Sequence, residues 1–463
     1  MKRAPQPVTP TDADRHPHRR TQGMILAAIL GLYALFSACH AVVTPVAPDA
    51  ATNYINAPDE AAHLAYVRSL ALGKGLPTPS GPFATYEWHQ PPLYYLLAAP
   101  LFRFGPHAVR GLSILLGLFA LVCLFLFART LDPGSPETAL FATGLAAFLP
   151  MRQAVYGAAN NDALTELCFT LTLLLCIRIV AHGLRFGQLA LLGIVLGASF
   201  LAKSSALLLA PVTAAAVVLA GCRHHASPKG YLLGFSSLVL AAIISLPWLH
   251  HMAALTGEVI PLHTFHQEFA GTMRATNFLE GRGFAADLWS GTAYPAGSMG
   301  RAEYLATVAN WTFRTFFGAY TPPGRPARLG IPYFMPPQFY LLFALIGLTG
   351  ALGWVRLLAA KGLKRQWDPG RLLPAILLIA LVVGAFGAFV WVYFQAQGRY
   401  LYPALAPMST LLAMGVSAVV PRARQAAAFI GITALLILLS AAFLMAGALP
   451  AYSAAPPAPP TPA

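Results

Sequence analysis

The sequence predicts an all-α integral membrane protein with about eleven transmembrane helices, one juxtamembrane helix and two large periplasmic loops. The 463 residues are 57% hydrophobic and only 10% charged, with a mean hydropathy of +0.62. Apolar runs repeatedly approach the ~20 residues that a bilayer-spanning helix needs. The basic residues, which give a net charge of +14, lie mostly in short loops between these runs. There they orient helices in the membrane, and they form no single patch for nucleic acid.

The chain begins with a basic tail, residues 1–23, which an apolar run at 24–43 follows. A basic leader before an apolar run also fits a signal peptide. The run is long for a signal peptide and many spans follow it, so we expect an uncleaved helix that starts in the cytoplasm and ends outside. The basic loops then place the spans at 24–43, 109–129, 139–156, 163–180, 189–201, 206–221, 231–250, 339–358, 372–394, 403–420 and 426–449.

The segment 91–104 decides the topology of everything after it. It has about two-thirds of the ~20 residues that a span needs. Pro91 and Pro92 stand at its start, where a missing N–H group leaves no helical hydrogen bond unmade. We therefore expect a juxtamembrane helix that does not cross. If it crossed, the loops with Arg223 and Lys361 would move outside, against the positive-inside rule.

These assignments divide the chain into five regions. Residues 1–23 form the cytoplasmic tail, and 24–250 form an N-terminal transmembrane module with a first outer loop at 44–108. Residues 251–337 form the second periplasmic loop, and 338–449 hold the C-terminal helices. The Pro/Ala-rich tail, 450–463, is too biased in composition to fold.

This topology gathers scarce polar side chains on the outer face, although they come from separate parts of the chain. They are Asp59, Glu60, His63, His89, Asp162, Lys203 and Arg399. Ionisable groups at a membrane are costly unless paired or hydrated, so their convergence predicts a functional site. Alternatively, Asp59 and Asp162 only cap helices, because each precedes an apolar run. We favour chemistry for Asp59, since Glu60 adds an acid that a cap does not require; for Asp162 both interpretations stay open.

Several short motifs resemble those of integral-membrane glycosyltransferases of the GT-C superfamily. They are Asp59-Glu60, His89-Gln90-Pro91-Pro92-Leu93-Tyr94-Tyr95, Asn161-Asp162-Ala163, Lys203-Ser204 and Gly398-Arg399-Tyr400 with Pro403. The likeness runs from 24 to 411 and is greatest to the bacterial branch with aminoarabinose transferases and relatives of protein O-mannosyltransferases. The resemblance implies a bacterial inner-membrane enzyme that transfers a hexosyl or pentosyl group. The donor would be a polyprenyl-phosphate sugar, and the acceptor a periplasmic or lipid-linked hydroxyl.

The implied mechanism gives each of these residues a role. Asp59 would be the general base of an inverting displacement, and Glu60 would share that role or orient Asp59. The leaving phosphate gains charge as the glycosidic bond breaks, so cations beside it stabilise the transition state. The candidate donor-phosphate ligands are Lys203, Arg399, His89 and Arg152. The candidate substrate-binding or supporting residues are Asp162, Asn161, His63, Tyr94 and Tyr400.

One position departs from the family pattern. Gln90 stands where aminoarabinose transferases carry a Lys directly before the Pro-Pro pair, so that phosphate contact is not carried over. No cofactor is required by the implied mechanism. A divalent metal is the weaker hypothesis, with Glu87, His63 and His89 as candidate ligands at irregular spacing.

The expected partners are a polyprenyl-phosphate-linked sugar, a lipid, glycan or protein acceptor, and membrane lipids. The loop 251–337 exceeds the ~12 to 15 residues of an ordinary connector, so it is either an acceptor-binding lid or a structural interfacial helix. Two alternatives to an enzyme stay open. One is a flippase or transporter for a lipid-linked sugar, which would show two similar halves and charges near helix midpoints. The other is a catalytically silent scaffold of the same fold.

Overall fold

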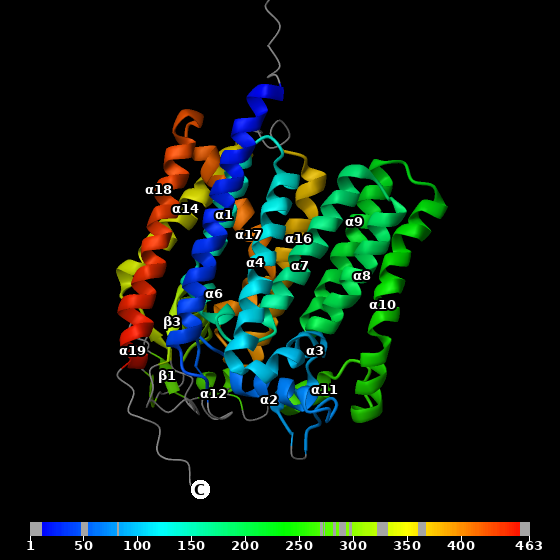
Figure 1. Ribbon diagram of the computed structural model, residues 1–463, viewed down its shortest axis with the longest axis vertical. Coiled ribbons are helices and arrows are strands. Elements are labelled where there is room, and N and C mark those ends of the chain that lie inside the picture. Colours follow the sequence, from blue (N-terminus) through cyan, green and yellow to red (C-terminus); the bar gives the residue numbers. More distant parts are fainter. Residues whose placement is uncertain are drawn as a thin grey trace, which may run out of the picture.

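The computed structural model describes residues 12–47, 54–80, 83–268, 272, 274–280, 284–286, 293–295, 299–321, 332–359 and 367–453. Within them the chain forms a bundle of long helices that run between two ends of the molecule (Figure 1). The first part of the expected basic tail, residues 1–11, and the last part of the Pro/Ala-rich tail, 454–463, lie outside the described residues.

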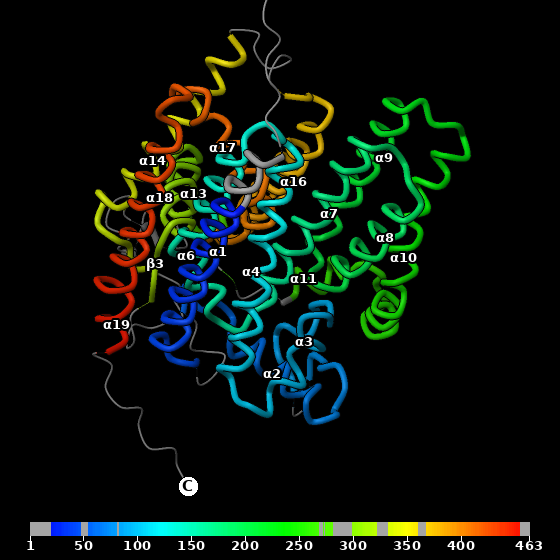
Figure 2. The backbone as a smooth tube through the Cα atoms, turned by 45° about the horizontal axis from the view of Figure 1, so that its top comes forward, coloured from blue at the N-terminus to red at the C-terminus, as the bar shows by residue number. Residues whose placement is uncertain are grey.

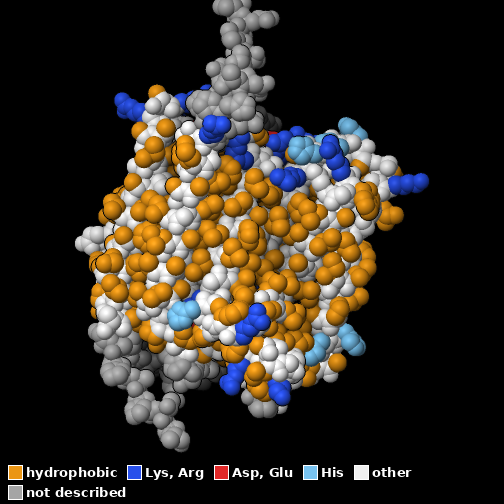
Figure 3. All heavy atoms as spheres, viewed as in Figure 1, with side chains coloured by type: hydrophobic (Ala, Val, Ile, Leu, Met, Phe, Trp, Pro, Cys, Tyr) orange, Lys and Arg blue, Asp and Glu red, His pale blue; other side chains and the backbone are white. Residues whose placement is uncertain are grey.

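Nine helical stretches of the described chain are long and apolar enough to cross a membrane. The helices in them are α1 (Asp12–Val43), α4 (Pro106–Leu131), α7 (Asp162–His182), α9 (Leu209–Arg223), α10 (Pro228–Thr256), α14 (Pro337–Ala359), α16 (Pro369–Val392), α17 (Leu405–Val419) and α18 (Arg422–Ala442). Side chains such as Val239, Ile243 and Leu348 are apolar and more than half exposed. Figure 3 shows a broad apolar band across the middle of the face it draws. The expected all-α membrane architecture is confirmed.

The expected count of eleven spans is not confirmed, and two segments account for the difference. The span expected at 139–156 is broken into α5 (Pro136–Ala147) and α6 (Pro150–Tyr156). Pro150 lacks an N–H group and stands at the first position of α6, where a proline begins a helix and cannot continue one. The span expected at 189–201 is α8 (Phe186–Ala202), an apolar helix of 17 residues.

The segment after Pro92 forms a short helix beside the bundle. It consists of α3 (Leu93–Ala98) and the 3₁₀ helix η2 (Ala99–Phe104). Six residues of each rise only about 21 Å together, which is short of a hydrocarbon core of about 30 Å. Figure 1 shows α3 next to α2 (Glu60–Ala71) at the lower end of the bundle. This agrees with the expected juxtamembrane helix.

The two ends of the bundle differ in character. The short helices α2, α3, α11 (Leu262–Glu268) and α12 (Ala275–Leu279) gather at the lower end in Figure 1. On the face that Figure 3 shows, Lys and Arg side chains gather mainly at the opposite, upper end. The lower end is therefore the one that carries the elaborate loops.

Further small elements complete this lower end. The helix α13 (Arg301–Phe317) lies between two antiparallel strand pairs in sequence, β1 (Phe284–Ala286) with β2 (Ala293–Pro295), and β3 (Ala319–Tyr320) with β4 (Tyr333–Phe334). After α18, the π-helical turn η6 (Phe443–Ala448) and α19 (Leu449–Ser453) extend the last helix beyond the expected boundary at 449. The Tyr452 hydroxyl donates to Asn56 Oδ1 at 2.6 Å, so the start of the tail is packed against the loop before α2.

Among the nine apolar stretches, the one in α7 is the most deeply buried, and α7 begins at Asp162. It packs against α4, α8, α9 and α16. In Figure 2, α8, α9 and α10 lie on one side of α7, while α14, α17 and α18 lie on the other. A residue at the start of α7 is therefore placed between the two groups of helices.

The close contact of α14 with α17 yields a stability prediction. A Cβ atom on Gly353 of α14 would lie 1.8 Å from the carbonyl oxygen of Gly415 in α17. Gly353→Ala must push the helices apart, and we expect it to lower the free energy of unfolding by about 1–3 kcal/mol. Gly347→Ala on the same helix is the matched control, because no described atom outside its own helix lies within 4 Å of the new Cβ. Thermal unfolding in detergent measures the difference, and equal melting temperatures would contradict the packing.

Candidate functional site

Asp59 stands directly before α2 with a backbone conformation that is uncommon for a residue with a side chain. Its φ of 60° and ψ of 13° are left-handed, a region where Asp and Asn are enriched among non-glycine residues. Within the described residues its side chain makes no capping hydrogen bond to α2. The carboxylate instead accepts hydrogen bonds from Arg399 Nη2 at 2.7 Å and from the Tyr86 hydroxyl. Helix capping therefore does not explain Asp59.

Asp162 is the first residue of α7, and its carboxylate also points away from its own helix. Its backbone N–H is capped by Asn160 Oδ1 at 3.0 Å. Its Oδ1 accepts from Lys203 Nζ at 2.5 Å, and its Oδ2 accepts from Arg399 Nη1 at 3.0 Å. Asp162 is therefore not the N-cap of α7, which is Asn161, and its carboxylate binds the side chains of Lys203 and Arg399.

Arg399 joins the two acids. Its Nη2 reaches Asp59, its Nη1 reaches Asp162, and its Nε donates to Gln397 Oε1 at 2.8 Å. It lies in the 3₁₀ helix η5 (Gly398–Ala404), which begins with a glycine for a steric reason. A Cβ on Gly398 would lie 2.4 Å from the backbone of Phe316, so only glycine lets η5 approach α13 this closely.

The four groups form a nearly closed and electrically balanced cluster. Two carboxylates face two cations, and the side chains are 18%, 10%, 17% and 5% exposed for Asp59, Asp162, Lys203 and Arg399. A buried guanidinium loses its hydration, so Arg399 depends on the carboxylates of Asp59 and Asp162 to stabilise its charge. The partial exposure of Lys203 and Asp59 leaves the cluster reachable by an anionic ligand.

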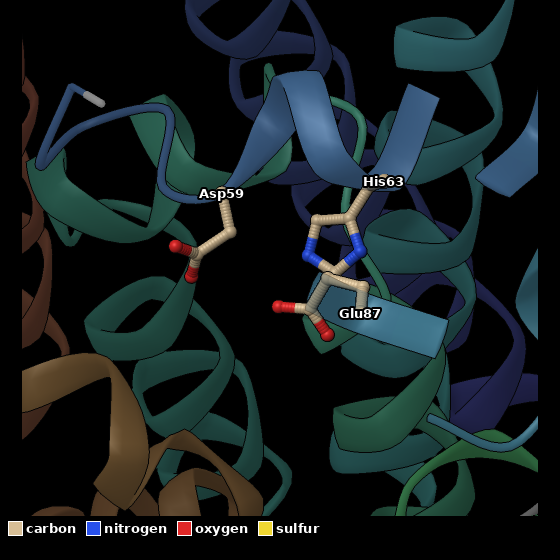
Figure 4. A group of neighbouring side chains, drawn as sticks. All are labelled: Asp59, His63 and Glu87. Atoms are coloured by element: carbon tan, nitrogen blue, oxygen red, sulfur yellow. The ribbon is translucent and has the colours of Figure 1, made fainter. Parts of the chain in front are cut away.

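A second, neutral group of side chains adjoins Asp59. Figure 4 shows His63 from α2 and Glu87 from η1 (Tyr86–His89) directed toward the space beside Asp59. Burial raises the pKa of Glu87 to about 8, and the charge of Asp59 adds to this shift. Burial also lowers the pKa of His63 to about 4. Both side chains are therefore uncharged at neutral pH.

Asp59 behaves in the opposite way. Burial alone would raise the pKa of Asp59. The charge of Arg399 outweighs burial, and the pKa of Asp59 is lowered. The charge of His63 and the hydrogen bonds from Tyr86 and Arg399 contribute less in the same direction. The pKa of Tyr86 is raised by burial and by the neighbouring carboxylate, so its hydroxyl remains a donor. The site thus pairs one ionised carboxylate with one protonated carboxylic acid, Glu87, a pattern typical of acid–base sites.

The same side chains could hold a divalent cation. Asp59, His63 and Glu87 each offer a ligand atom, and these atoms lie within 4.8 Å of one another. Glu87 Oε2 is buried without a hydrogen-bond partner among the described residues, which suits a ligand atom. Of the three ligands expected from the sequence, His89 is not in this group: its Nδ1 faces the Tyr86 carbonyl at 2.8 Å, and Asp59 takes its place.

Two expected site residues are not brought to the cluster. Glu60 is 1% exposed and its carboxylate binds Arg110 through Nε at 2.7 Å and Nη2 at 2.5 Å. Arg152 is fully buried and binds Glu166 through Nε at 2.9 Å and Nη2 at 3.0 Å. Each side chain is held in a separate buried ion pair. We therefore do not propose Glu60 as a general base or Arg152 as a ligand of the donor phosphate.

The remaining expected residues differ in their contacts. The Tyr400 ring lies 4.9 Å from the Arg399 guanidinium, and His63 Nδ1 is 2.9 Å from the Tyr95 hydroxyl. Asn161 Nδ2 is buried without a hydrogen-bond partner among the described residues, so it is available to a ligand. The Tyr94 hydroxyl is buried against Ser113 Oγ at 2.8 Å, which is a packing role.

Sequence reasoning missed three residues of this region. Tyr86 and Gln397 bind Asp59 and Arg399, but both lie in polar loops where many residues look alike. Arg110 did carry a signal, because it is a charged residue just inside the apolar run at 109–129, and such residues are functional or paired by default.

Comparison with known proteins identifies the fold. The family described as dolichyl-phosphate-mannose-protein mannosyltransferase matches residues 89–249. No curated protein matches the sequence significantly. The solved structure of ArnT from Cupriavidus metallidurans bound to undecaprenyl phosphate is 15% identical, with a TM-score of 0.51, over 91% of this chain and 74% of that one. ArnT in the apo state is 14% identical, with a TM-score of 0.50, over 92% and 75%.

A second kind of structure is also similar. The Archaeoglobus fulgidus oligosaccharyltransferase in complex with zinc and sulfate is 13% identical, with a TM-score of 0.47, over 91% of this chain. The present chain spans only about half of that protein, 53% of its length. The expected resemblance is confirmed at the level of the fold: the chain has a GT-C-like membrane glycosyltransferase fold, which the ArnT structures share over most of its length, and the family model matches residues 89–249.

The raised pKa of Glu87 yields a prediction about stability. In the unfolded chain this carboxyl ionises near its ordinary value, 4.5, whereas in the fold it does so at about 8. Wild-type stability should therefore fall, relative to Glu87→Gln, as pH rises from about 4.5 to about 8, by up to roughly 4 kcal/mol. Melting temperatures of both proteins in detergent between pH 5 and 9 measure this difference.

Glu137→Gln is the control, because Glu137 is exposed in the first turn of α5. Its melting temperature should follow that of the wild type at every pH. A constant difference between wild type and Glu87→Gln would mean that Glu87 is ionised in the folded protein, against the prediction.

Proposed function

We propose that this chain moves a sugar from a polyprenyl-phosphate carrier to an acceptor hydroxyl at the outer surface of the membrane, with inversion at the anomeric carbon. The observation that carries the proposal is the pairing of Asp59 and Asp162 with Lys203 and Arg399 at one end of a GT-C-like bundle. A carboxylate can take a proton from the acceptor and cations can bind the phosphate, so one cluster holds both functions that the reaction needs. The likeness to ArnT, which was solved with undecaprenyl phosphate, supports this class of donor.

Asp59 is the proposed general base. The acceptor hydroxyl gives its proton to the Asp59 carboxylate while its oxygen bonds to the anomeric carbon. The bond from that carbon to the phosphate oxygen breaks, and the phosphate leaves with the electron pair. A single displacement of this kind inverts the configuration. The lowered pKa of Asp59 supports the role, because the carboxylate is ionised and ready to accept a proton.

Lys203 and Arg399 are the proposed phosphate ligands. The planar guanidinium can donate two parallel hydrogen bonds to a phosphate, and the Lys203 ammonium adds a point charge. Both cations are held by carboxylates in the resting site, and we propose that the donor phosphate competes with Asp59 for Arg399. When Arg399 turns toward the phosphate, Asp59 loses the attraction that lowers its pKa and becomes a stronger base. Donor binding would thus activate the base.

The charge distribution supports the orientation. Lys and Arg gather mainly at the end opposite the cluster (Figure 3), and the positive-inside rule assigns that end to the cytoplasm. The N-terminus of α1 lies at the same end (Figure 1). The proposed site then faces the periplasm of a bacterial inner membrane, where a lipid, glycan or protein acceptor would meet it.

The proposed reaction uses protein groups throughout. If a divalent cation is bound, Asp59, His63 and Glu87 are the residues that would hold it, and it would supply electrostatic stabilisation of anionic groups in the site. We propose that Asn161, whose Nδ2 is buried without a hydrogen-bond partner among the described residues, and Tyr400, whose ring lies against Arg399, contact the substrate.

A test of the base and of the phosphate ligands follows directly. Asp59→Asn should lower kcat on the order of 10²- to 10⁴-fold, since it removes the proton acceptor. Arg399→Lys keeps a positive charge but loses the planar fork, so it should lower kcat/KM for the donor. Transfer from lipid-linked sugar donors by the purified full-length protein in detergent or nanodiscs measures these losses.

Asp132→Asn, at the other end of the bundle after α4, is the matched control and should keep wild-type activity. Full activity of Asp59→Asn would rule out the general-base role. A wild-type protein that moves lipid-linked sugar across a vesicle membrane without forming a product would instead be a flippase.

A further inference from the structure

Glu60 neighbours the proposed base but is used in a different way. It is the first residue of α2, and hydrogen bonds reach both of its carboxylate oxygens. Oε1 accepts from Arg110 Nε at 2.7 Å and from the backbone N–H of Ala159 at 2.8 Å, and Oε2 accepts from Arg110 Nη2 at 2.5 Å. A carboxylate so fully engaged cannot take a proton from a substrate. It can hold the backbone of the residue beside it.

Arg110 spreads this contact over three helices. It lies in the first turns of α4 and is fully buried. Besides Glu60, its Nη1 donates to the carbonyls of Ala41 at 2.5 Å and Thr44 at 2.8 Å, and its Nη2 donates to that of Pro45 at 3.2 Å. All five N–H donors of the guanidinium are thereby matched. These carbonyls belong to the C-terminal end of α1, where a cation is favoured by the helix dipole.

The bond to Ala159 links this contact to the second acid of the site. Ala159 lies three residues before Asp162, in the turn that leads into α7. Asn160 follows Ala159 directly. Its Oδ1 accepts a hydrogen bond from the backbone N–H of Asp162 at 3.0 Å, and its Nδ2 donates to the Val155 carbonyl. The ion pair of Glu60 and Arg110 therefore connects two backbone segments. One carries Asp59, next to Glu60, and the other runs from Ala159 to Asp162.

We infer that Glu60 and Arg110 are positioning residues that set the separation between Asp59 and Asp162, and with it the grip of both acids on Arg399. This inference rests on the proposed function. Few residues with a side chain adopt the left-handed backbone of Asp59, so the residue keeps this conformation only where its surroundings impose it. Glu60 is the adjacent residue, and the buried ion pair between its carboxylate and the Arg110 guanidinium supplies that constraint.

A second buried ion pair shows what a mainly structural role looks like. Arg152 and Glu166 have the same fork geometry and are equally buried. Arg152 Nη2 also donates to the Gly117 carbonyl at 3.1 Å, and its guanidinium lies near the Tyr33 and Tyr156 rings. This pair binds neither the Asp59 segment nor Ala159. It therefore serves as an internal comparison for loss of stability.

The experiment compares Glu60→Gln, the double variant Glu60→Gln with Arg110→Gln, and Glu166→Gln in the full-length protein. The double variant leaves no unpaired buried charge at this position, which separates positioning from a failure to fold. Each variant is assayed for kcat, for donor KM, for the acid limb of the pH–rate profile and for melting temperature. Hydrogen–deuterium exchange of residues 54–62 reports on the segment itself, without any need for transfer.

We expect both Glu60 variants to lose kcat on the order of 10²-fold, as a misplaced catalytic group does. Their acid limb should move to higher pH, because a looser Asp59 feels less of the charge of Arg399 and its pKa rises toward the ordinary value. Exchange at 54–62 should increase. Glu166→Gln should lose a comparable amount of melting temperature without a shift of the acid limb or of this exchange.

Wild-type kcat and an unmoved acid limb in the double variant would overturn the positioning role, whatever its melting temperature. The same conclusion would follow if Glu166→Gln shifted the acid limb equally. If the wild type transfers no sugar, the proposed function fails, while unchanged exchange at 54–62 in the Glu60 variants would separately refute the positioning role.

Discussion

Arg399 holds two carboxylates that lie far apart in the sequence, Asp59 at 2.7 Å and Asp162 at 3.0 Å, and the end of the bundle that carries α2, α3 and α11 is arranged around this contact. Removing the guanidinium would leave Asp59 without its cation and Asp162 with Lys203 alone, which is unfavourable for partly buried carboxylates. An anion that competes with Asp59 for Arg399 would change the charge around the proposed base.

The fold supplies this arrangement through its irregular segments. The segment between α6 and α7 presents the Ala159 N–H to Glu60 and leads into Asp162. The 3₁₀ helix η5 brings Arg399 close to α13, where Gly398 packs against Phe316. The short helix α3 lies beside α2, with η1 and Glu87 before it. Non-helical backbone near a membrane is tolerated where protein surrounds it. The regular helices hold the irregular segments in place, and the irregular segments carry the residues of the site.

The architecture and the gathering of Asp59, Asp162, Lys203 and Arg399 could be predicted from sequence, because hydrophobic length and basic loops fix which helix ends share a side. The number of spans could not, since composition stays apolar through the break at Pro150. Which acid meets which cation was also beyond sequence reasoning. Glu60 looks as reactive as Asp59, and only the position of Arg110 shows that its carboxylate is occupied.

A structure of the protein with bound polyprenyl phosphate tests the central claim most directly. The account predicts phosphate oxygens within hydrogen-bond distance of Arg399 and Lys203, together with loss of the contact between Arg399 and Asp59. A phosphate bound elsewhere, with Arg399 still bridging Asp59 and Asp162 as it does now, would contradict it.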